Sequence, residues 1–351
     1  MLIHRLKRLA PAIILLAVAG TAISARAADE VVAADGTKTL GWIVTLTAEN
    51  ATVLTDKDGL KRVPIRGATI RFDFAAQARC AVVTRGDKQT VAARLTSFKD
   101  DAFGGATDDG KEWACARADV RSAEFYPTAR LGRSLPVAHS RQKPDYCGEA
   151  CVEMVSKYLG RPVTQDQVNA AGGLDGKRGV YSNELERAVV GLKLRAAPAA
   201  ASLPHRTPED AVADRWQLVR AIERNRPVLL GIWADPERKT NPAWNFDHFV
   251  LLVGYDLRKQ AMIVHDPGHD AFTEWSFTDF PKHRETRSHL VYQIEFPSMR
   301  AWTMKDGAKV DGEFVGCADG RVRLRDSAGG EKVVALADLS DADQEYIEKL
   351  K

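Results

Sequence analysis

The segment Gln142-Lys-Pro-Asp-Tyr-Cys147-Gly-Glu-Ala-Cys-Val-Glu-Met-Val-Ser-Lys-Tyr-Leu-Gly160 gives the first firm indication of how this chain folds. Pro144 and Asp145 are typical of a turn that precedes a helix. After Cys147 the apolar residues are spaced three and four positions apart, as on the buried face of a helix; they are Ala150, Cys151, Met154, Val155, Tyr158 and Leu159. Gly160, followed by Pro162, ends the pattern. We therefore predict a loop that leads directly into a helix beginning at Cys147.

Cys147 occupies the predicted N-terminus of this helix. Unsatisfied N–H groups and the positive end of the helix dipole favour a thiolate at that position. Gln142 lies five residues upstream, close enough for its side-chain amide to reach the same point in space. A thiolate and an amide donor that share a site are two parts of an acyl-transfer centre. The alternative is a structural cysteine, since cysteine is among the most buried residue types.

Two apolar runs further along the chain supply a candidate base and a candidate acid to orient it. One run is Asp247-His-Phe-Val-Leu-Leu-Val-Gly-Tyr-Asp256, and the other is Ala261-Met-Ile-Val-His265, which Asp266 follows. We predict that they form adjacent antiparallel strands joined by a short turn. The start of one strand then lies beside the end of the other, so that His248 and Asp266 are close together. A histidine base and the acid that orients it need this arrangement. The alternative for His248 is a hydrogen-bonded histidine of the core.

Other residues near these motifs offer further alternatives. Cys151 falls on the apolar face of the predicted helix and is expected in the core. His265 should face away from Asp266, because neighbouring residues of a strand point to opposite faces, and His269 is the main rival for a second role. Asp247 is the alternative orienting acid. The histidines and Asp266 form no recognised ligand set, so we predict neither a metal nor another cofactor.

A family resemblance rests on these motifs taken together. The order Gln-x4-Cys-Gly-x-x-Cys, then His-Phe-Val-Leu-Leu-Val-Gly-Tyr-Asp, then Asp-Pro-Gly resembles the papain-like cysteine peptidases of the bacteriocin-leader-processing type, cysteine peptidase family thirty-nine, over about residues 134–297. The resemblance implies that Cys147 is the nucleophile and His248 the base. It also implies that Asp266 is the orienting acid and Gln142 the oxyanion-hole donor. No transporter domain accompanies the motifs in this sequence, so specificity for double-glycine leaders is not implied.

The composition is ordinary for a globular protein. The 351 residues suffice for two or three domains, and they include 45% apolar and 28% charged residues. A net charge of +3 points to no particular partner, and no nucleic-acid-binding signature is present. Five cysteines are too few for a disulfide scaffold.

The first residues have the features of a secretory signal over 1–27. Arg5, Lys7 and Arg8 form a basic start, an apolar centre follows, and Ala25-Arg-Ala27 resembles a cleavage site. The apolar run is too short to span a bilayer comfortably. We therefore expect an exported protein, periplasmic or secreted, with no stable membrane span after cleavage. The alternative is an uncleaved membrane anchor.

Residues 28–126 have the pattern of two repeated small β-barrel-like modules. Gly36, Ile65 and Ile70 recur 50 residues later as Gly86, Cys115 and Val120, and an Asp-Gly turn stands in each half. We assign no chemistry to this region. Cys80 and Cys115 have two interpretations, a disulfide or two buried thiols.

The region between the catalytic motifs predicts helices followed by strands, which is an α+β plan. Thr164-Gln-Asp-Gln167 is a capping box for a short helix. Gly172-Gly-Leu-Asp-Gly-Lys-Arg-Gly179 lacks the signature of a phosphate-binding loop, and we interpret it as a loop of the substrate cleft. Helices are expected from Ser182 and over Trp216 to Glu223, and a buried strand over Arg226 to Trp233.

Residues 299–351 resemble a different family, the first SLA-one homology domain of endocytic adaptors. The resemblance rests on Arg300-Ala-Trp-Thr303, Val333-Val-Ala-Leu336, Leu339-Ser340 and Asp343, among others. It implies a small SH3-like barrel that binds short peptide motifs. Asp341 to Leu350 is expected to form a closing helix.

The sequence as a whole thus predicts an exported cysteine peptidase acting on a peptide or protein substrate. We expect a papain-like α+β domain over 127–298, with helices packed on a small antiparallel sheet, flanked by all-β SH3-like modules that are dispensable for the chemistry. A fragment of about residues 128–299 should therefore fold alone. Two alternative functions use the same residues: a transglutaminase-like acyl transferase, and a peptide-binding protein that has lost catalysis.

Overall fold

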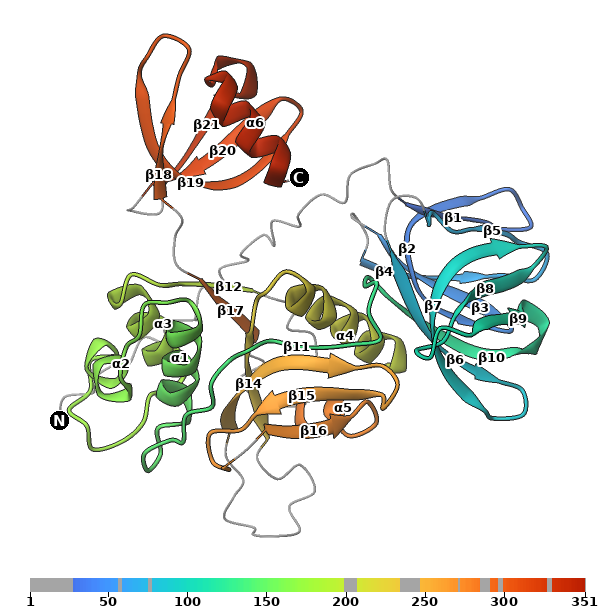
Figure 1. Cartoon of the computed structure of the whole chain (residues 1–351), viewed down its shortest axis with the longest axis horizontal. Helices are drawn as coiled ribbons and strands as arrows, with labels where there is room; N and C mark the ends of the chain where they lie inside the picture. Colours follow the sequence, from blue (N-terminus) through green and yellow to red (C-terminus); the bar gives the residue numbers. More distant parts are fainter. Residues whose placement is uncertain are drawn as a thin grey trace, which may run out of the picture.

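The structure is a computed structural model that describes residues 28–350 except 56–58, 75–77, 199–206, 234–246, 271, 285–290, 296–298 and 327–329. The expected signal segment, 1–27, lies outside the described residues. Among the helices that are described, none is long and apolar enough to cross a membrane. The fold is mixed α/β, with antiparallel sheets and few helices (Figure 1).

The first sheet is built by residues 29–126 in the strand order β4-β3-β2-β10-β6-β7-β8-β9, with β1 pairing β2 and β5. Its strands are β1 (Asp29–Val32), β2 (Lys38–Thr47), β3 (Asn50–Thr55), β4 (Gly59–Pro64), β5 (Thr69–Arg71), β6 (Arg79–Arg85), β7 (Thr90–Lys99), β8 (Ala102–Ala106), β9 (Glu112–Ala116) and β10 (Val120–Tyr126). A short 3-10 turn, η1 (Arg117–Asp119), precedes β10.

The same pairing scheme occurs twice in this sheet. β1 pairs with β2 and with β5, and β6 pairs with β7 and with β10 in the same manner. The next strands also pair in the same way in both halves: β2 with β3 and β3 with β4 in the first, and β7 with β8 and β8 with β9 in the second. This recurrence matches the spacing that the sequence repeat suggested.

The two halves are joined by a buried ion pair as well as by strand pairing. β10 pairs with β2 of the first half. Asp29 at the start of β1 accepts hydrogen bonds from both terminal nitrogens of Arg79 in β6, each at 2.9 Å, and both side chains are 1% exposed. Asp29 also accepts bonds from the backbone N–H groups of Ile43 and Asp73. The carboxylate is thus fully hydrogen-bonded, as a buried charge must be.

The disulfide interpretation of Cys80 and Cys115 is wrong in this structure. Both are free thiols in different core clusters. Burial raises the pKa of Cys80 to about 12, which makes it an unreactive apolar side chain. The alternative of two buried thiols describes what the structure contains.

The second sheet carries the candidate site. Its order is β12-β17-β13-β14-β15-β16, and β11 pairs β14. The strands are β11 (Gly132–Ser134), β12 (Arg195–Pro198), β13 (Val228–Trp233), β14 (Asp247–Asp256), β15 (Ala261–His265), β16 (Phe272–Ser276) and β17 (Val291–Glu295). The helices of this region are α1 (Cys147–Tyr158), α2 (Gln165–Ala171), α3 (Ser182–Gly191), α4 (Pro208–Glu223) and α5 (Phe280–Arg284).

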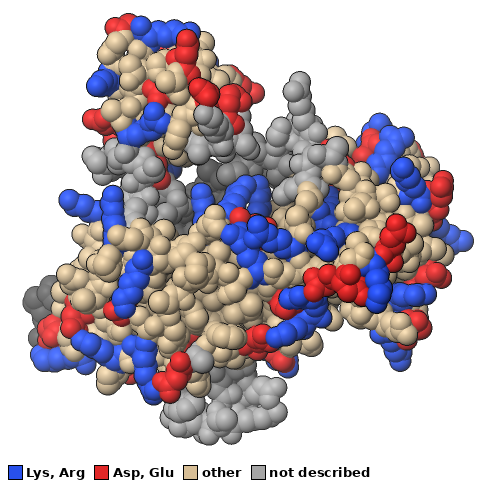
Figure 2. Space-filling view, viewed as in Figure 1, with Lys and Arg blue, Asp and Glu red and all other residues tan. Residues whose placement is uncertain are grey.

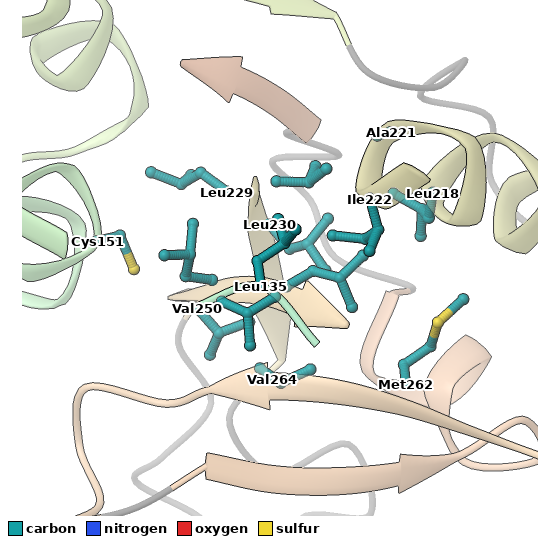
Figure 3. Packing of buried hydrophobic residues seen from close by; sticks show 14 of the residues in the cluster. Leu135, Cys151, Leu218, Ala221, Ile222, Leu229, Leu230, Val250, Met262 and Val264 are labelled. Atoms are coloured by element: carbon teal, nitrogen blue, oxygen red, sulfur yellow. The ribbon is translucent and has the colours of Figure 1, made fainter. Parts of the chain in front are cut away.

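Helices α1 and α4 both pack against this sheet and share one apolar core. Figure 3 shows the side chains at its centre. They come from α1, from strands β13, β14 and β15, from the segment after β11, and from α4: Cys151, Leu229, Leu230, Val250, Met262, Val264, Leu135, Leu218, Ala221 and Ile222. Cys151 is fully buried, as its place on the apolar face predicted.

The starts of α2 and α4 follow from capping chemistry. Thr164 and Gln167 form the capping box of α2, as predicted. α4 begins at Pro208, eight residues before the predicted start at Trp216, because Thr207 and Asp210 form a second capping box and Pro208 occupies the first turn. Sequence analysis missed this signal, although Thr-Pro-Glu-Asp carries it.

The N-terminal sheet and the second sheet are not independent units. Cys80, Val82 and Tyr126 of the first sheet belong to the same buried cluster as the strands around β14. Trp42 of β2 packs on Trp216 of α4 with ring centroids 5.6 Å apart. Figure 1 shows α4 between the two sheets. A fragment of residues 128–299 would expose this apolar surface, so whether it folds alone stays a prediction that the shared core weighs against.

A buried charge reinforces the same interface. Arg215 of α4 donates to Glu124 of β10 at 2.9 Å and to the Tyr126 hydroxyl at 3.3 Å. Its guanidinium also lies 4.7 Å from the Phe277 ring. Burial alone would lower the pKa of Arg215, but Tyr126 and Glu124 outweigh burial and raise it.

The C-terminal region forms a four-stranded sheet in the order β18-β19-β20-β21 with a helix at its end. Its elements are β18 (Met299–Thr303), β19 (Lys309–Ala318), β20 (Arg321–Arg325), β21 (Glu331–Ala335), η2 (Leu336–Asp338) and α6 (Asp341–Leu350). Trp302, fully buried, anchors a separate core and donates to Gly312 O at 2.8 Å. The closing helix is where the sequence predicted it.

Figure 2 shows acidic and basic side chains next to one another over the visible face of the chain. The mixture agrees with the small net charge of +3.

Candidate active site

Cys147 is the first residue of α1, and its side chain is half-buried. The backbone N–H groups of this first turn have no partner within the helix, and the dipole makes this end positive. The next residue is Gly148, and its position has no room for a side chain. A Cβ there would lie 3.0 Å from Val180 Cγ2 and 3.2 Å from Phe249 Cδ2. This close approach brings the first turn of α1 against β14 beside His248.

His248 and Asp266 lie together at one end of the β14–β15 hairpin. The register pairs Leu251 with His265, so the start of β14 meets the residue that follows β15. His248 Nε2 is 2.8 Å from Asp266 Oδ1, and both residues are 8% exposed. This bond leaves the other ring nitrogen, Nδ1, for Cys147, whose interaction with the imidazole raises the pKa of His248. The structure therefore brings the sequence-predicted histidine and acid into contact, next to the predicted cysteine.

The surroundings favour a charged imidazole. Burial alone lowers the pKa of His248, but the hydrogen bonds to Asp266 and Cys147 and their charges outweigh it and raise the pKa to about 10. Burial likewise tends to raise the pKa of Asp266, whereas the bond from His248 lowers it below the usual range. Gly268 N–H also donates to Asp266 Oδ1, at 2.8 Å. A carboxylate held in this way stabilises a histidinium and fixes the orientation of its ring.

Gln142 reaches the same place from the loop before α1. Its backbone N–H donates to Pro267 O at 2.9 Å, in the turn that follows Asp266. A Cβ built on Gly268 would lie 3.2 Å from Asp266 Oδ1 and 3.9 Å from both Gln142 Oε1 and His248 Nε2. These three side chains therefore converge on one point. Gln142 Oε1 is buried without a hydrogen-bond partner.

Gln165 holds the loop on both sides of Gln142, and sequence analysis missed it. Its Oε1 accepts from Lys143 N–H at 2.9 Å, and its Nε2 donates to Arg141 O at 2.9 Å. Gln165 is buried at the first residue of α2. The capping box identified that helix start, but nothing in the local pattern shows what its first side chain contacts.

The glycine-rich loop 172–179 is bound to the first turn of α1. Asn169 of α2 accepts from Gly176 N–H at 3.0 Å and donates to Arg178 O at 2.8 Å. Gly179 packs so closely on the loop before Cys147 that a Cβ there would lie 1.8 Å from Asp145 O. The loop therefore forms a wall next to Cys147.

Glu149 is the charged anchor of this wall and another residue that sequence analysis missed. Its Oε1 accepts from Asn169 Nδ2 at 2.8 Å and from Val180 N–H at 2.9 Å. Burial raises the pKa of Glu149. A glutamate two residues after Cys147 on the helix could have been noticed, because glutamate is rarely fully buried without a partner.

The rival residues occupy other positions. Cys151 is fully buried, and burial raises the pKa of its thiol well above the usual value. His265 is also buried and bonds to Val137 O at 2.9 Å, on the opposite side from His248, as alternation predicted. His269 is largely exposed, with Nε2 3.7 Å from Asp266 Oδ2. The Asp247 side chain lies outside the described residues.

Over the described part of the chain, no group of three His, Cys, Asp or Glu residues could hold a metal ion.

Comparison with known families assigns two segments of the chain. Residues 134–289 match the Peptidase_C39 like family. Residues 293–351 match the SLA1 homology domain 1, SHD1. Both resemblances inferred from the sequence motifs are thereby confirmed.

Comparison with individual proteins adds a structural likeness. No curated protein matches the sequence. Among solved structures, the chain is similar to the crystal structure of a double glycine motif protease from an AMS/PCAT transporter in complex with the leader peptide. The identity is 16%, the TM-score is 0.31, and the match covers 46% of this chain and 93% of that one.

Proposed function

We propose that this chain, a cysteine-type peptidase by the family match of residues 134–289, hydrolyses peptide bonds with Cys147 as nucleophile. His248 acts as base and acid, Asp266 orients it, and Gln142 supplies an oxyanion donor. One observation carries the proposal: His248 Nε2 lies 2.8 Å from Asp266 Oδ1, and Cys147 at the start of α1 acts on the same imidazole and raises its pKa.

The reaction follows from this arrangement. His248 takes the proton of Cys147, and the thiolate attacks the carbonyl carbon of the scissile bond. The tetrahedral oxyanion is held by the Gln142 amide and by the backbone N–H of Cys147, which has no partner within the helix. His248 then gives its proton to the leaving amine, and a thioester joins the acyl group to Cys147. Water, activated by His248, hydrolyses the thioester and restores the thiol.

The architecture suggests where a substrate lies. The half-buried Cys147 has the wall 172–179 beside it and the segment that carries Gln142 near its partner His248. We infer that an extended peptide passes between them. The modules at 28–126 and 299–351 flank the proposed catalytic domain, 127–298. We propose that all of them are SH3-like barrels and that the C-terminal one binds a short peptide.

Export is a further part of the proposal. It rests on the basic, apolar and Ala25-Arg-Ala27 features of the first 27 residues. The test is expression of the full chain followed by N-terminal sequencing of the exported product. We expect it to begin at Ala28, whereas a chain found uncleaved in the cytoplasm would contradict export.

The main experiment is activity-based labelling of the purified mature protein with an epoxide cysteine-protease probe, followed by mapping of the modified residue. We expect modification at Cys147 and none in Cys147→Ala. A peptide library with and without an added primary amine identifies the acceptor of the acyl group. Products with free carboxyl ends in the presence of amine support hydrolysis, whereas amide products indicate an acyl transferase. Absence of labelling and of turnover indicates a binding protein.

A further inference from the structure

We propose that His139 is a positioning residue that holds the segment carrying Gln142 against the turn carrying Asp266. The inference deepens the proposed function and rests on it, because it explains how an oxyanion donor and a triad acid from distant parts of the chain keep one geometry.

Three hydrogen bonds join the two segments side by side. His265 Nε2 bonds to Val137 O, and His139 Nε2 bonds to Asp266 O, each at 2.9 Å. Gln142 N–H donates to Pro267 O, also at 2.9 Å. Along the first segment the bonded residues are 137, 139 and 142, and along the second they are 265, 266 and 267. His139 is thus the central contact, and its partner is the backbone of the proposed triad acid itself.

The chemistry of these bonds fixes one form of each ring. Both acceptors are carbonyl oxygens, so Nε2 of each imidazole must carry the hydrogen. His265 Nδ1 is then a buried lone pair, and it has no partner. The two rings meet edge to face with centroids 5.3 Å apart. Each ring therefore limits the rotation of the other, and both keep Nε2 directed at a carbonyl.

Apart from these bonds, the exposed side chain of Arg141 pairs with Asp270 on this side. Residues 135–143 belong to no strand or helix, so no ladder of backbone hydrogen bonds fixes them. Leu135 N–H donates to Val253 O at the start of the segment, and Gln165 supports its far side. Between these points His139 is the side chain that reaches from the segment to Asp266. A misplacement of about 1 Å in a catalytic group can cost ~100-fold in rate.

The first test compares three variants of neighbouring residues. His139→Ala removes the bond. His139→Gln restores a donor, because the glutamine amide nitrogen can occupy the place of Nε2. Ser140→Ala is the matched control: Ser140, on the same segment, accepts a hydrogen bond from Lys157 Nζ of α1 at 3.0 Å, and among the described residues its side chain has no bond to Asp266. We expect kcat to fall ~10–100-fold in His139→Ala with little change in KM, to recover in His139→Gln, and to stay at the parent value in Ser140→Ala.

A double-mutant cycle separates positioning from general loss of structure. If His139 acts through Gln142, His139→Ala should cost less than about 2-fold when introduced into Gln142→Ala, because the donor is already absent. Circular dichroism confirms folding in each variant. Equal losses in the two backgrounds, or full activity of His139→Ala, would overturn the proposal.

Hydrogen exchange decides the question without any turnover. The Gln142 amide should exchange slowly in the parent, in Ser140→Ala and in His139→Gln, and faster in His139→Ala, since its bond to Pro267 O depends on the seated segment. Unchanged protection in His139→Ala would refute the positioning role even in an inactive protein. If the parent cleaves no peptide while exchange behaves as expected, the proposed function fails, and His139 is left as a residue that holds the segment without a catalytic consequence.

Discussion

Replacing Asp266 by asparagine tests how the triad controls its histidine. Asp266 Oδ1 accepts two hydrogen bonds, from His248 Nε2 and from Gly268 N–H, each at 2.8 Å. An asparagine oxygen can accept both bonds, so the shape of the site is kept while the negative charge is lost. The variant therefore separates the effect of charge from the effect of packing.

The magnitude follows from the pKa of His248. A neighbouring opposite charge typically shifts a pKa by ~1–3 units. Loss of the Asp266 charge should lower the His248 pKa by that amount from its value of about 10. The imidazolium is the form that accompanies the thiolate, so activity is lost as pH rises through this pKa. We expect the alkaline limb of kcat/KM to move to lower pH by ~1–3 units.

The rate at neutral pH should fall less than in a serine enzyme. There, the equivalent change can cost ~10⁴-fold because the imidazole adopts the wrong tautomer. A thiol is more acidic than a hydroxyl and needs less help from the base. We expect a loss of ~10–100-fold for Asp266→Asn, smaller than the serine-enzyme figure for that reason.

The assay compares Asp266→Asn with Asp247→Asn on one peptide substrate between pH 5 and pH 10, with circular dichroism as the check on folding. Asp247 directly precedes His248 and should leave both rate and pH profile near those of the parent. If Asp247→Asn is the impaired variant, or if the alkaline limb of Asp266→Asn stays in place, the reasoning from the hairpin geometry is refuted.

Three further changes have defined outcomes. Cys147→Ala should abolish epoxide labelling while Cys151→Ala keeps it, because Cys151 is fully buried; mapping by mass spectrometry would show the reverse if the helix register were wrong. Glu124→Gln should destabilise the chain by ~3–5 kcal/mol in urea unfolding, since it leaves Arg215 buried without its ionic partner; an unchanged unfolding midpoint would show that the interface tolerates the charge. Glu149→Ala should lower stability by ~1–3 kcal/mol for each donor left unpaired, and Glu149→Gln by less, because it keeps an acceptor; equal losses in both variants, measured in the same way, would count against the hydrogen bonds as the cause.

The local patterns of the sequence were enough to place the main parts of the site. The three-four spacing after Cys147 predicted α1 to its first residue, and the run from His248 to Asp256 predicted the hairpin that brings Asp266 alongside. Both are statements about neighbours in sequence or about one short turn, where periodicity is informative.

The supporting contacts could not be predicted, because they join residues that are far apart in the sequence. His139 and Gln165 make bonds to residues far along the chain, and His139 lies in a segment without periodicity. The interface of Trp42 with Trp216 likewise joins elements that no local pattern relates. Only the fold brings such pairs together, and it builds a buried cluster with residues on both sides of the predicted boundary at residue 127.

The ion pair between Asp29 and Arg79 has a consequence for the order in which the chain can acquire its structure. A ribosome delivers Asp29 fifty residues before Arg79, and until then the carboxylate would be buried without its counter-ion. The first half of the N-terminal sheet therefore gains little by closing early, and β1 should dock only once β6 has emerged. We therefore expect residues 29–126 to fold together in one step, and more slowly than independent small modules would, because β2–β10 pairing and the Asp29–Arg79 ion pair join residues far apart in the sequence.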